Sequence, residues 1–148
     1  MTLPMTPPIS PLDLLVDFYE RLQPADLARL PQLYAAEARF KDPFNEVQGI
    51  AAIEAVFEHM FRRLQGPRFV VTERVDGGEQ AFLTWDFLFT LPGEHSERRI
   101  RGATHLRFDA AGRVTLHRDY WDAAEELYEQ LPVLGALMRW LKRRARRG

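Results

Sequence analysis

The sequence contains no cysteine, and this absence excludes several kinds of site. Disulfide frameworks, thiolate nucleophiles and cysteine-ligated zinc or iron–sulfur centres all need a side chain that the 148 residues lack. Long apolar runs are also missing, and the first nine residues have neither a basic start nor a continuous apolar stretch. The simplest expectation is a cytoplasmic protein.

Acidic residues are absent after Glu129, although the chain holds 21 of them. The part of the chain up to Glu129 contains 14 of the 20 basic residues, so its net charge is −7 and that of the remaining tail is +6. Nucleic acid phosphates must be met by a basic surface, and a body this acidic is a poor partner for them. We therefore expect no nucleic acid to bind.

The rest of the composition is that of a globular protein, with 46% hydrophobic and 28% charged residues. A chain of this length fits one domain that buries about two thirds of its unfolded surface, which leaves room for a pocket. We predict a flexible N-terminus over residues 1–9, a single domain over 10–130 and a basic amphipathic C-terminal helix over 131–148.

Helices are predicted in the first half of the chain. Ser10, followed by a proline and an acid, favours the start of a helix that ends near Pro24. A second short helix is expected over residues 26–36, and a short extended piece over 39–44. The clearest helix is predicted over 49–64, because apolar residues recur there at three- and four-residue spacing.

Strands are predicted from Arg68 onward, where apolar and polar residues alternate with a period of two in four runs. Turn signals rich in glycine, proline and aspartate separate these runs at residues 76–78, 92–93 and 109–112. Helices followed by strands indicate a segregated α+β domain, with the helices on one face of an antiparallel sheet.

The strand predicted over residues 80–91 has two different faces, since alternate side chains of a strand point to opposite sides. One face is wholly apolar and includes Trp85, Phe87 and Phe89. The other carries Asp86, and an acid at such a position is costly unless it is paired, solvated by a cavity or put to use.

A second acid lies on the final strand, where His117, Asp119 and Trp121 share one face. If the helices cover the faces that hold the acids, the aromatic face of the sheet points outward and needs a second subunit to cover it. In the reverse arrangement, the aromatic residues form the core and the acids face water. The residues alone leave both arrangements open.

One longer pattern is typical of a known family. The segment Tyr-Ala-Ala-Glu-Ala-Arg-Phe-Lys-Asp-Pro-Phe over 34–44, Gly49 opening a helix, and residues 107–121 closely resemble ketosteroid isomerases. Over about residues 10–128 the chain is similar to the nuclear-transport-factor-2-like (NTF2-like) superfamily, which includes SnoaL-like proteins and limonene epoxide hydrolase. The resemblance implies an NTF2-like (cystatin-like) cone, in which N-terminal helices pack on a strongly curved antiparallel sheet around a pocket, usually in a dimer.

The resemblance to ketosteroid isomerase implies that Asp42 is a general base, which shuttles a proton beside a carbonyl. The isomerase's oxyanion donors fall at Phe18, with Tyr19 one residue away, and at Thr104. Because phenylalanine offers no proton and threonine only a hydroxyl, authentic steroid isomerisation is not expected. A structural role for Asp42 is also open, because aspartate before proline commonly bonds the next backbone amides.

The resemblance to limonene epoxide hydrolase implies a second arrangement, with Asp86 and Asp119 at the positions of that enzyme's paired acid and base. Two such carboxylates could open an epoxide, one protonating the oxygen and one activating water. The arginine that bridges the pair falls at Thr84, and the residues that hold the water fall at Phe40 and Asp42. Both resemblances place the three acids, with Thr104, His117 and Trp121, on the pocket side.

These patterns lead us to expect a small apolar, oxygen-bearing molecule in the pocket, with proton transfer or water addition as the chemistry. The alternative is a non-catalytic small-molecule-binding or dimerisation domain of the same fold. The catalytic candidates are Asp42, Asp86, Asp119 and His117, and the substrate-binding candidates are Phe18, Tyr19, Phe40, Phe57, Phe82, Thr84, Thr104 and Trp121.

Other partners follow from the same patterns. No cofactor is expected, and no metal, because His59, His95 and His105 are scattered without ligand spacing. The basic C-terminal helix is expected to dock its apolar side on its own domain, with contact to a membrane as the alternative. A homodimer is expected through the outer face of the sheet, with Trp85, Phe87 and Phe89.

Overall fold

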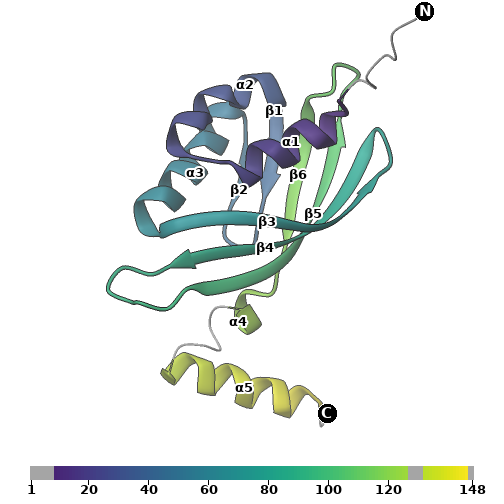
Figure 1. The fold of residues 1–148 in the computed structure, drawn as a ribbon. Helices are drawn as coiled ribbons and strands as arrows, with labels where there is room; N and C mark the ends of the chain where they lie inside the picture. Colours follow the sequence, from purple (N-terminus) through teal and green to yellow (C-terminus); the bar gives the residue numbers. More distant parts are fainter. Residues whose placement is uncertain (1–8, 127–131, 147–148) are drawn as a thin grey trace, which may run out of the picture.

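The computed structural model describes residues 9–126 and 132–146, and in it helices lie on one side of a bent sheet (Figure 1). The prediction of a flexible N-terminus falls outside the described residues except for Ile9. The elements in chain order are α1 (Pro11–Glu20), the short 3-10 helix η1 (Pro24–Arg29), α2 (Leu30–Leu33), β1 (Tyr34–Lys41), β2 (Glu46–Gln48), α3 (Ile50–Arg63), β3 (Gln65–Asp76), β4 (Gln80–Thr90), β5 (Arg98–Phe108), β6 (Val114–Tyr120), α4 (Ala123–Glu126) and α5 (Pro132–Arg146).

The two longer N-terminal helices begin where local signals predict. The Ser10 hydroxyl oxygen accepts a hydrogen bond from the backbone N–H of Asp13 at 3.1 Å, and a proline occupies the first turn of α1. Gly49 precedes α3 with a φ of 94°, a conformation that glycine adopts more readily than other residues. Both helix predictions are confirmed.

The helix predicted over residues 26–36 is wrong in its last part, because the chain enters β1 at Tyr34. Tyr34, Ala38 and Phe40 are buried while Arg39 is exposed, so this segment follows the period of a strand. A register shift between Tyr34 and Arg39 interrupts the pairing of β1 with β6. The interruption breaks the alternation in the sequence and hides the strand.

The six strands are ordered β2-β1-β6-β5-β4-β3. Neighbouring strands are antiparallel except β1 and β6, which run parallel. The α+β class is confirmed, but the expectation of a purely antiparallel sheet is wrong. The parallel pair arises because β1 precedes α3 and then pairs with the last strand of the β3–β6 meander, which a crossover connection permits.

β4 buries the aromatic face that was expected to point outward. Trp85 and Phe89 are 6% and 3% exposed, whereas Phe82 on the opposite face is 48% exposed. Burying one large apolar side chain stabilises a domain by about 1.5–3 kcal/mol. Burying the aromatic face of β4 therefore stabilises the fold more than burying the face that carries Asp86 would. The predicted orientation of β4 is wrong, and the residues chosen for the dimer surface lie on the inner side. A homodimer stays a prediction without that surface.

The pairing of β4 with β5 makes room for the inward tryptophan. Trp85 lies opposite Gly102 in the register, and a Cβ at Gly102 would collide with the indole ring. Glycine in a strand commonly marks such a close approach. The indole Nε1–H also donates a hydrogen bond to the hydroxyl of Thr104 at 2.7 Å, so the buried ring keeps no unpaired donor.

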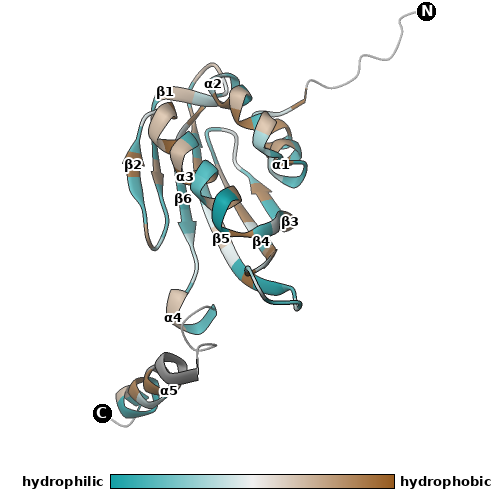
Figure 2. Ribbon diagram, turned by 90° about the vertical axis from the view of Figure 1, so that its left-hand side faces the viewer, coloured by the Kyte–Doolittle hydropathy of each residue, from teal (hydrophilic) through white to brown (hydrophobic). Residues whose placement is uncertain are grey.

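The C-terminal helix α5 lies apart from the sheet in both ribbon views (Figures 1 and 2). Leu137, Trp140 and Leu141 are 49%, 46% and 45% exposed. The expectation that α5 docks its apolar side on its own domain is therefore wrong for these residues. In the described part of the chain, no helix has the length and apolar composition needed to cross a membrane.

Candidate functional site

A cavity of about 310 Å³ opens between α3, the turn after β1 and the concave side of the sheet. This volume lies at the lower end of the range for small-molecule pockets. The walls are mostly apolar and include Phe57 from α3, Phe69 from β3 and Phe87 from β4. The rings of Phe69 and Phe87 are stacked with their centres 4.6 Å apart. Such a lining favours a small apolar ligand.

Asp119, at the end of β6, borders both this cavity and a smaller recess of about 30 Å³. Tyr19, Thr104 and His117 line the recess. The Asp119 side chain is only 16% exposed. A carboxylate at such a position is costly unless polar groups stabilise it.

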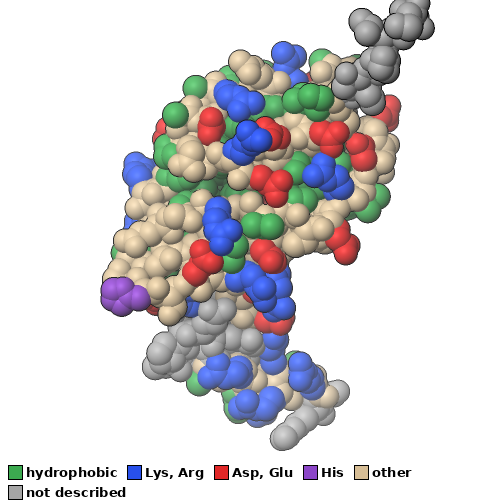
Figure 3. Space-filling view, viewed as in Figure 1, with side chains coloured by type: hydrophobic (Ala, Val, Ile, Leu, Met, Phe, Trp, Pro, Cys, Tyr) green, Lys and Arg blue, Asp and Glu red, His purple; other side chains and the backbone are tan. Residues whose placement is uncertain are grey.

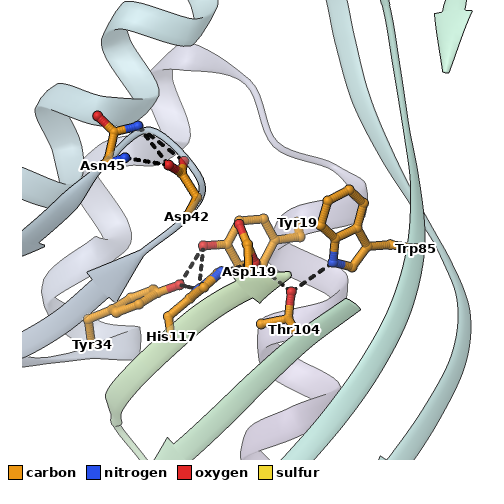
Figure 4. A network of polar contacts seen from close by, with 8 residues as sticks. All are labelled: Tyr19, Tyr34, Asp42, Asn45, Trp85, Thr104, His117 and Asp119. Atoms are coloured by element: carbon orange, nitrogen blue, oxygen red, sulfur yellow. Dashed lines mark hydrogen bonds and ion pairs between the residues drawn. The ribbon is translucent and has the colours of Figure 1, made fainter. Parts of the chain in front are cut away.

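Two hydrogen bonds end on the same oxygen of Asp119 (Figure 4). The Thr104 hydroxyl donates to Asp119 Oδ1 at 2.6 Å, and Nε2 of His117 lies 2.8 Å from that oxygen. Thr104 directs its hydrogen to Asp119 because its own oxygen accepts the Trp85 indole N–H. Asp119 Oδ2 has no hydrogen-bond partner among the described residues, so it is the oxygen available to a ligand.

Behind His117, two tyrosine hydroxyls continue the chain of hydrogen bonds (Figure 4). The Tyr34 hydroxyl lies 2.7 Å from His117 Nδ1 and hydrogen-bonds to the Tyr19 hydroxyl, which lies 3.4 Å from the same nitrogen. Burial raises the pKa of Tyr19 and Tyr34 well above the ordinary tyrosine value. Both hydroxyls are therefore neutral near pH 7, and each has one hydrogen to donate.

The direction of this chain follows from the number of hydrogens that need acceptors. With Nδ1 of His117 as acceptor, Tyr34 donates to it, Tyr19 donates to Tyr34, and the Nε2–H donates to Asp119. If Nδ1 carried a hydrogen instead, one tyrosine hydrogen would find no acceptor among the described residues. A buried polar group without a partner costs about 1–3 kcal/mol. This series of hydrogen bonds therefore places the ring hydrogen of His117 on Nε2, from which it is donated to Asp119 Oδ1.

Asp42 borders the same cavity, but its carboxylate binds its own turn. Oδ1 accepts the backbone N–H groups of Phe44 at 2.8 Å and of Asn45 at 2.7 Å. The Asn45 side-chain amide donates to Oδ1 at 3.0 Å and to Oδ2 at 3.1 Å. These bonds favour the structural reading, in which aspartate before proline closes a turn. The role of Asp42 as a base stays a prediction.

Asp86 and its neighbours do not reach the cavity. Asp86 lies on the outer face of β4 with the Arg99 guanidinium 3.9 Å away. Thr84 hydrogen-bonds to Thr72 at 2.7 Å, and Phe82 stacks on His105 with ring centres 4.5 Å apart. The prediction that these residues face the pocket is wrong, because successive strand residues alternate and Trp85 takes the inner side. Asp86 and Asp119 therefore cannot act as a pair on one ligand.

The remaining predicted residues divide between cavity, recess and core. Phe40, Phe57 and Trp121 line the cavity, while Tyr19 lines the recess. Phe18 lines neither, because it is 1% exposed and packs edge-on against Tyr19 with ring centres 5.3 Å apart. Adjacent helix positions point about 100° apart, so only one of the two α1 aromatics can face the recess.

The sequence analysis did not predict that Tyr34 and Trp85 belong to the hydrogen-bonded network around Asp119. Tyr34 falls in a segment assigned to a helix, and Trp85 was assigned to the outer face. The glycine opposite Trp85 is a signal that could have found the inward indole, since a glycine inside a strand often makes room for another group. No local signal distinguishes Tyr34, whose partner His117 is 83 positions away.

A metal site has no support within residues 9–126 and 132–146. No three histidine, aspartate or glutamate side chains there gather closely enough to hold a metal ion. His117 and Asp119 instead bond to each other and to the hydroxyl groups of Tyr34 and Thr104.

The family model described as the SnoaL-like domain matches residues 15–117 of the chain. This match covers more than half of the sequence, and the chain belongs to the SnoaL-like domain family. A search of curated protein sequences finds no match.

Solved structures share the fold at low sequence identity. One is a hypothetical protein with a ketosteroid isomerase-like fold from Catenulispora acidiphila, in complex with trimethylamine. It is 18% identical, with 83% of this chain and 92% of that chain covered and a TM-score of 0.67. An NTF2-like protein of unknown function from Burkholderia pseudomallei is 19% identical, with 78% and 92% covered and a TM-score of 0.68. An LEH-like epoxide hydrolase from M. tuberculosis is 16% identical, with 78% and 85% covered and a TM-score of 0.65.

Proposed function

We propose that this protein binds a small, mostly apolar molecule in the cavity and that Asp119 accepts a proton from it. The observation that carries the proposal is the position of Asp119 beside an apolar cavity, with Oδ1 held by Thr104 and His117 and Oδ2 without a hydrogen-bond partner in residues 9–126 and 132–146. A positioned carboxylate of this kind can abstract a weakly acidic hydrogen, such as one on the carbon next to a carbonyl.

In the proposed step, Asp119 Oδ2 takes the proton, the carbon–hydrogen bond breaks, and its electron pair moves into the carbonyl to give an enolate. His117 cannot receive this proton through Nε2, because that nitrogen already carries the hydrogen that it donates to Asp119. Asp119 then delivers a proton to the same molecule, at the original carbon or at another carbon of the enolate. A proton that Asp119 first exchanges with water gives hydrogen exchange, and delivery to another carbon gives an isomer. The net reaction is a hydrogen exchange or an isomerisation without any cofactor.

The test measures exchange of the α-hydrogens of β-tetralone for deuterium in D₂O by NMR. Asp119→Asn keeps an oxygen that can accept from Thr104 and His117 but removes the base, so we expect the exchange rate to fall by about 100-fold or more. The matched control is Asp86→Asn, which removes the same charge from the outer face of the sheet and should leave the rate unchanged. Full exchange by the Asp119 variant would disprove the assignment.

A second candidate function is binding without catalysis, and the contacts of Asp42 favour it. Because that carboxylate is used by its own turn, Asp42 does not act with Asp119 as an acid–base pair, and among the described residues of the cavity Asp119 is the carboxylate with an oxygen outside any hydrogen bond. Asp119 would then orient a ligand hydroxyl. In this case the protein binds β-naphthol about tenfold more tightly than naphthalene, a difference of about 1.4 kcal/mol that Asp119→Asn removes. That preference without exchange of the β-tetralone hydrogens would support binding alone.

A further inference from the structure

The helix α5 concentrates the positive charge of the chain. Between Pro132 and Arg146 it has no acidic residue, while the part of the chain up to Glu129 carries a net charge of −7. In Figure 3, the coloured charged side chains of α5 are blue. On the body of the protein above it, red and blue side chains are mixed. The basic residues of α5 are Arg139, Lys142, Arg143, Arg144 and Arg146.

One side of α5 is apolar and exposed. Leu137, Trp140 and Leu141 are spaced by three and four residues, so they lie on the same side of the helix. All three are between 45% and 49% exposed, and no described strand or helix packs extensively against α5. By the same helical spacing Arg139 and Arg146 fall on the opposite side, while Arg143, three residues after Trp140, lies at the edge of the apolar side.

One cation, Arg144, falls on the apolar side itself, four residues after Trp140 and three after Leu141. The guanidinium of Arg144 is 5.4 Å from the centre of the Trp140 ring. Long basic side chains can lay their apolar stems along a hydrophobic surface and keep the charge at its edge. The apolar side of α5 is therefore bordered by positive charge.

We propose that α5 binds the surface of an anionic lipid bilayer, with Leu137, Trp140 and Leu141 entering the headgroup region. Basic amphipathic helices with tryptophan and leucine on one side lie in this way in the plane of the interface. Tryptophan in particular favours the boundary between lipid and water. The basic residues lie near the anionic lipid headgroups, which attract them.

Other partners would match either the basic residues of α5 or its exposed apolar side, but not both. A nucleic acid would meet the basic residues but leave the apolar side in water, and the acidic body would repel it. A second copy of α5 would cover the apolar side but bring two strongly basic helices together. One contact between α5 and the rest of the chain lies at α4, where the Lys142 ammonium is 4.0 Å from the Glu125 carboxylate. This contact does not involve Leu137, Trp140 or Leu141.

The experiment is co-sedimentation of the full chain with vesicles of phosphatidylcholine that contain about a quarter phosphatidylglycerol, compared with pure phosphatidylcholine. We expect binding to the anionic vesicles that weakens as salt rises from about 0.1 M to about 1 M. Two double variants separate the contributions of charge and apolar area. Arg143→Glu with Arg146→Glu and Leu137→Ser with Trp140→Ser should each lower the affinity about tenfold or more.

The matched control is Arg39→Glu with Arg113→Glu, which makes the same change in net charge at two exposed positions of the body and should change the affinity less than about twofold. Failure of the wild-type chain to bind the anionic vesicles would overturn the proposal, as would equal binding by either α5 variant. Binding to duplex DNA that survives Leu137→Ser with Trp140→Ser, without vesicle binding, would indicate a nucleic acid partner instead. A dimer in sedimentation that this variant dissociates, again without vesicle binding, would indicate a second copy.

Discussion

Tyr34→Phe tests the direction of the buried hydrogen-bond chain. The substitution keeps a ring that is 0% exposed and removes only the hydroxyl 2.7 Å from His117 Nδ1. One lost hydrogen bond costs about 1 kcal/mol, and an unsatisfied buried acceptor raises the cost to as much as about 3 kcal/mol. Tyr19 limits this loss because its hydroxyl, 3.4 Å from Nδ1, can donate in place of Tyr34. We expect the free energy of unfolding to fall by about 1–2 kcal/mol.

A double-mutant cycle with Tyr19→Phe gives this prediction a sharper form. Tyr19→Phe alone leaves the Tyr34 bond to Nδ1 intact and should cost about 1 kcal/mol. In the double variant no hydroxyl remains to donate to Nδ1, so the compensation seen in Tyr34→Phe is lost. The double variant should therefore be less stable than the sum of the single effects predicts, by about 0.5 kcal/mol or more.

The assay is urea unfolding at neutral pH followed by circular dichroism, together with nitrogen NMR of the His117 ring. The wild-type spectrum should show a neutral ring with its hydrogen on Nε2. A Tyr34→Phe variant as stable as wild type would show that Nδ1 does not depend on this donor. A hydrogen on Nδ1 in the wild-type protein would refute the proposed direction of these hydrogen bonds, and with it the assignment of Asp119 as the acceptor of the Nε2–H.

The remaining predictions concern the sheet and the turn after β1. Asp42→Asn should keep β-tetralone exchange within about twofold of wild type, because the side chain holds its turn, and loss of exchange would restore Asp42 as the base. Gly102→Ala should destabilise the fold by about 1–3 kcal/mol in thermal unfolding, since its Cβ collides with the Trp85 ring, and an unchanged melting temperature would contradict that packing. Trp85→Asp should yield insoluble or unfolded protein, whereas Phe82→Asp should fold with a free energy of unfolding within about 1 kcal/mol of wild type. The opposite result in circular dichroism would show that Phe82, and not Trp85, lies on the buried face of β4.

Elements with local signals were predicted well. Ser10 and the proline after it set the start of α1, and the apolar stripe after Gly49 defines α3, because capping and helical periodicity act within one or two turns. The closing of the Asp42 turn by the backbone of residues 44 and 45 is also local, and was one of two readings open in the sequence. β1 was missed in part because its alternation is broken where its pairing with β6 shifts register.

The sequence by itself determined the alternation of β4, and so which of its residues stand together, because the period of a strand is a property of the backbone. Only the tertiary structure decided which group lines the cavity. That choice depends on Gly102 in the neighbouring strand, which makes room for Trp85, and on the larger apolar area of the aromatic face. The same holds for the site, where Tyr34 and His117 are 83 positions apart and meet only through the parallel pairing of β1 with β6. Their hydrogen bond, and the series of hydrogen bonds that ends on Asp119, exist only once the layers have packed.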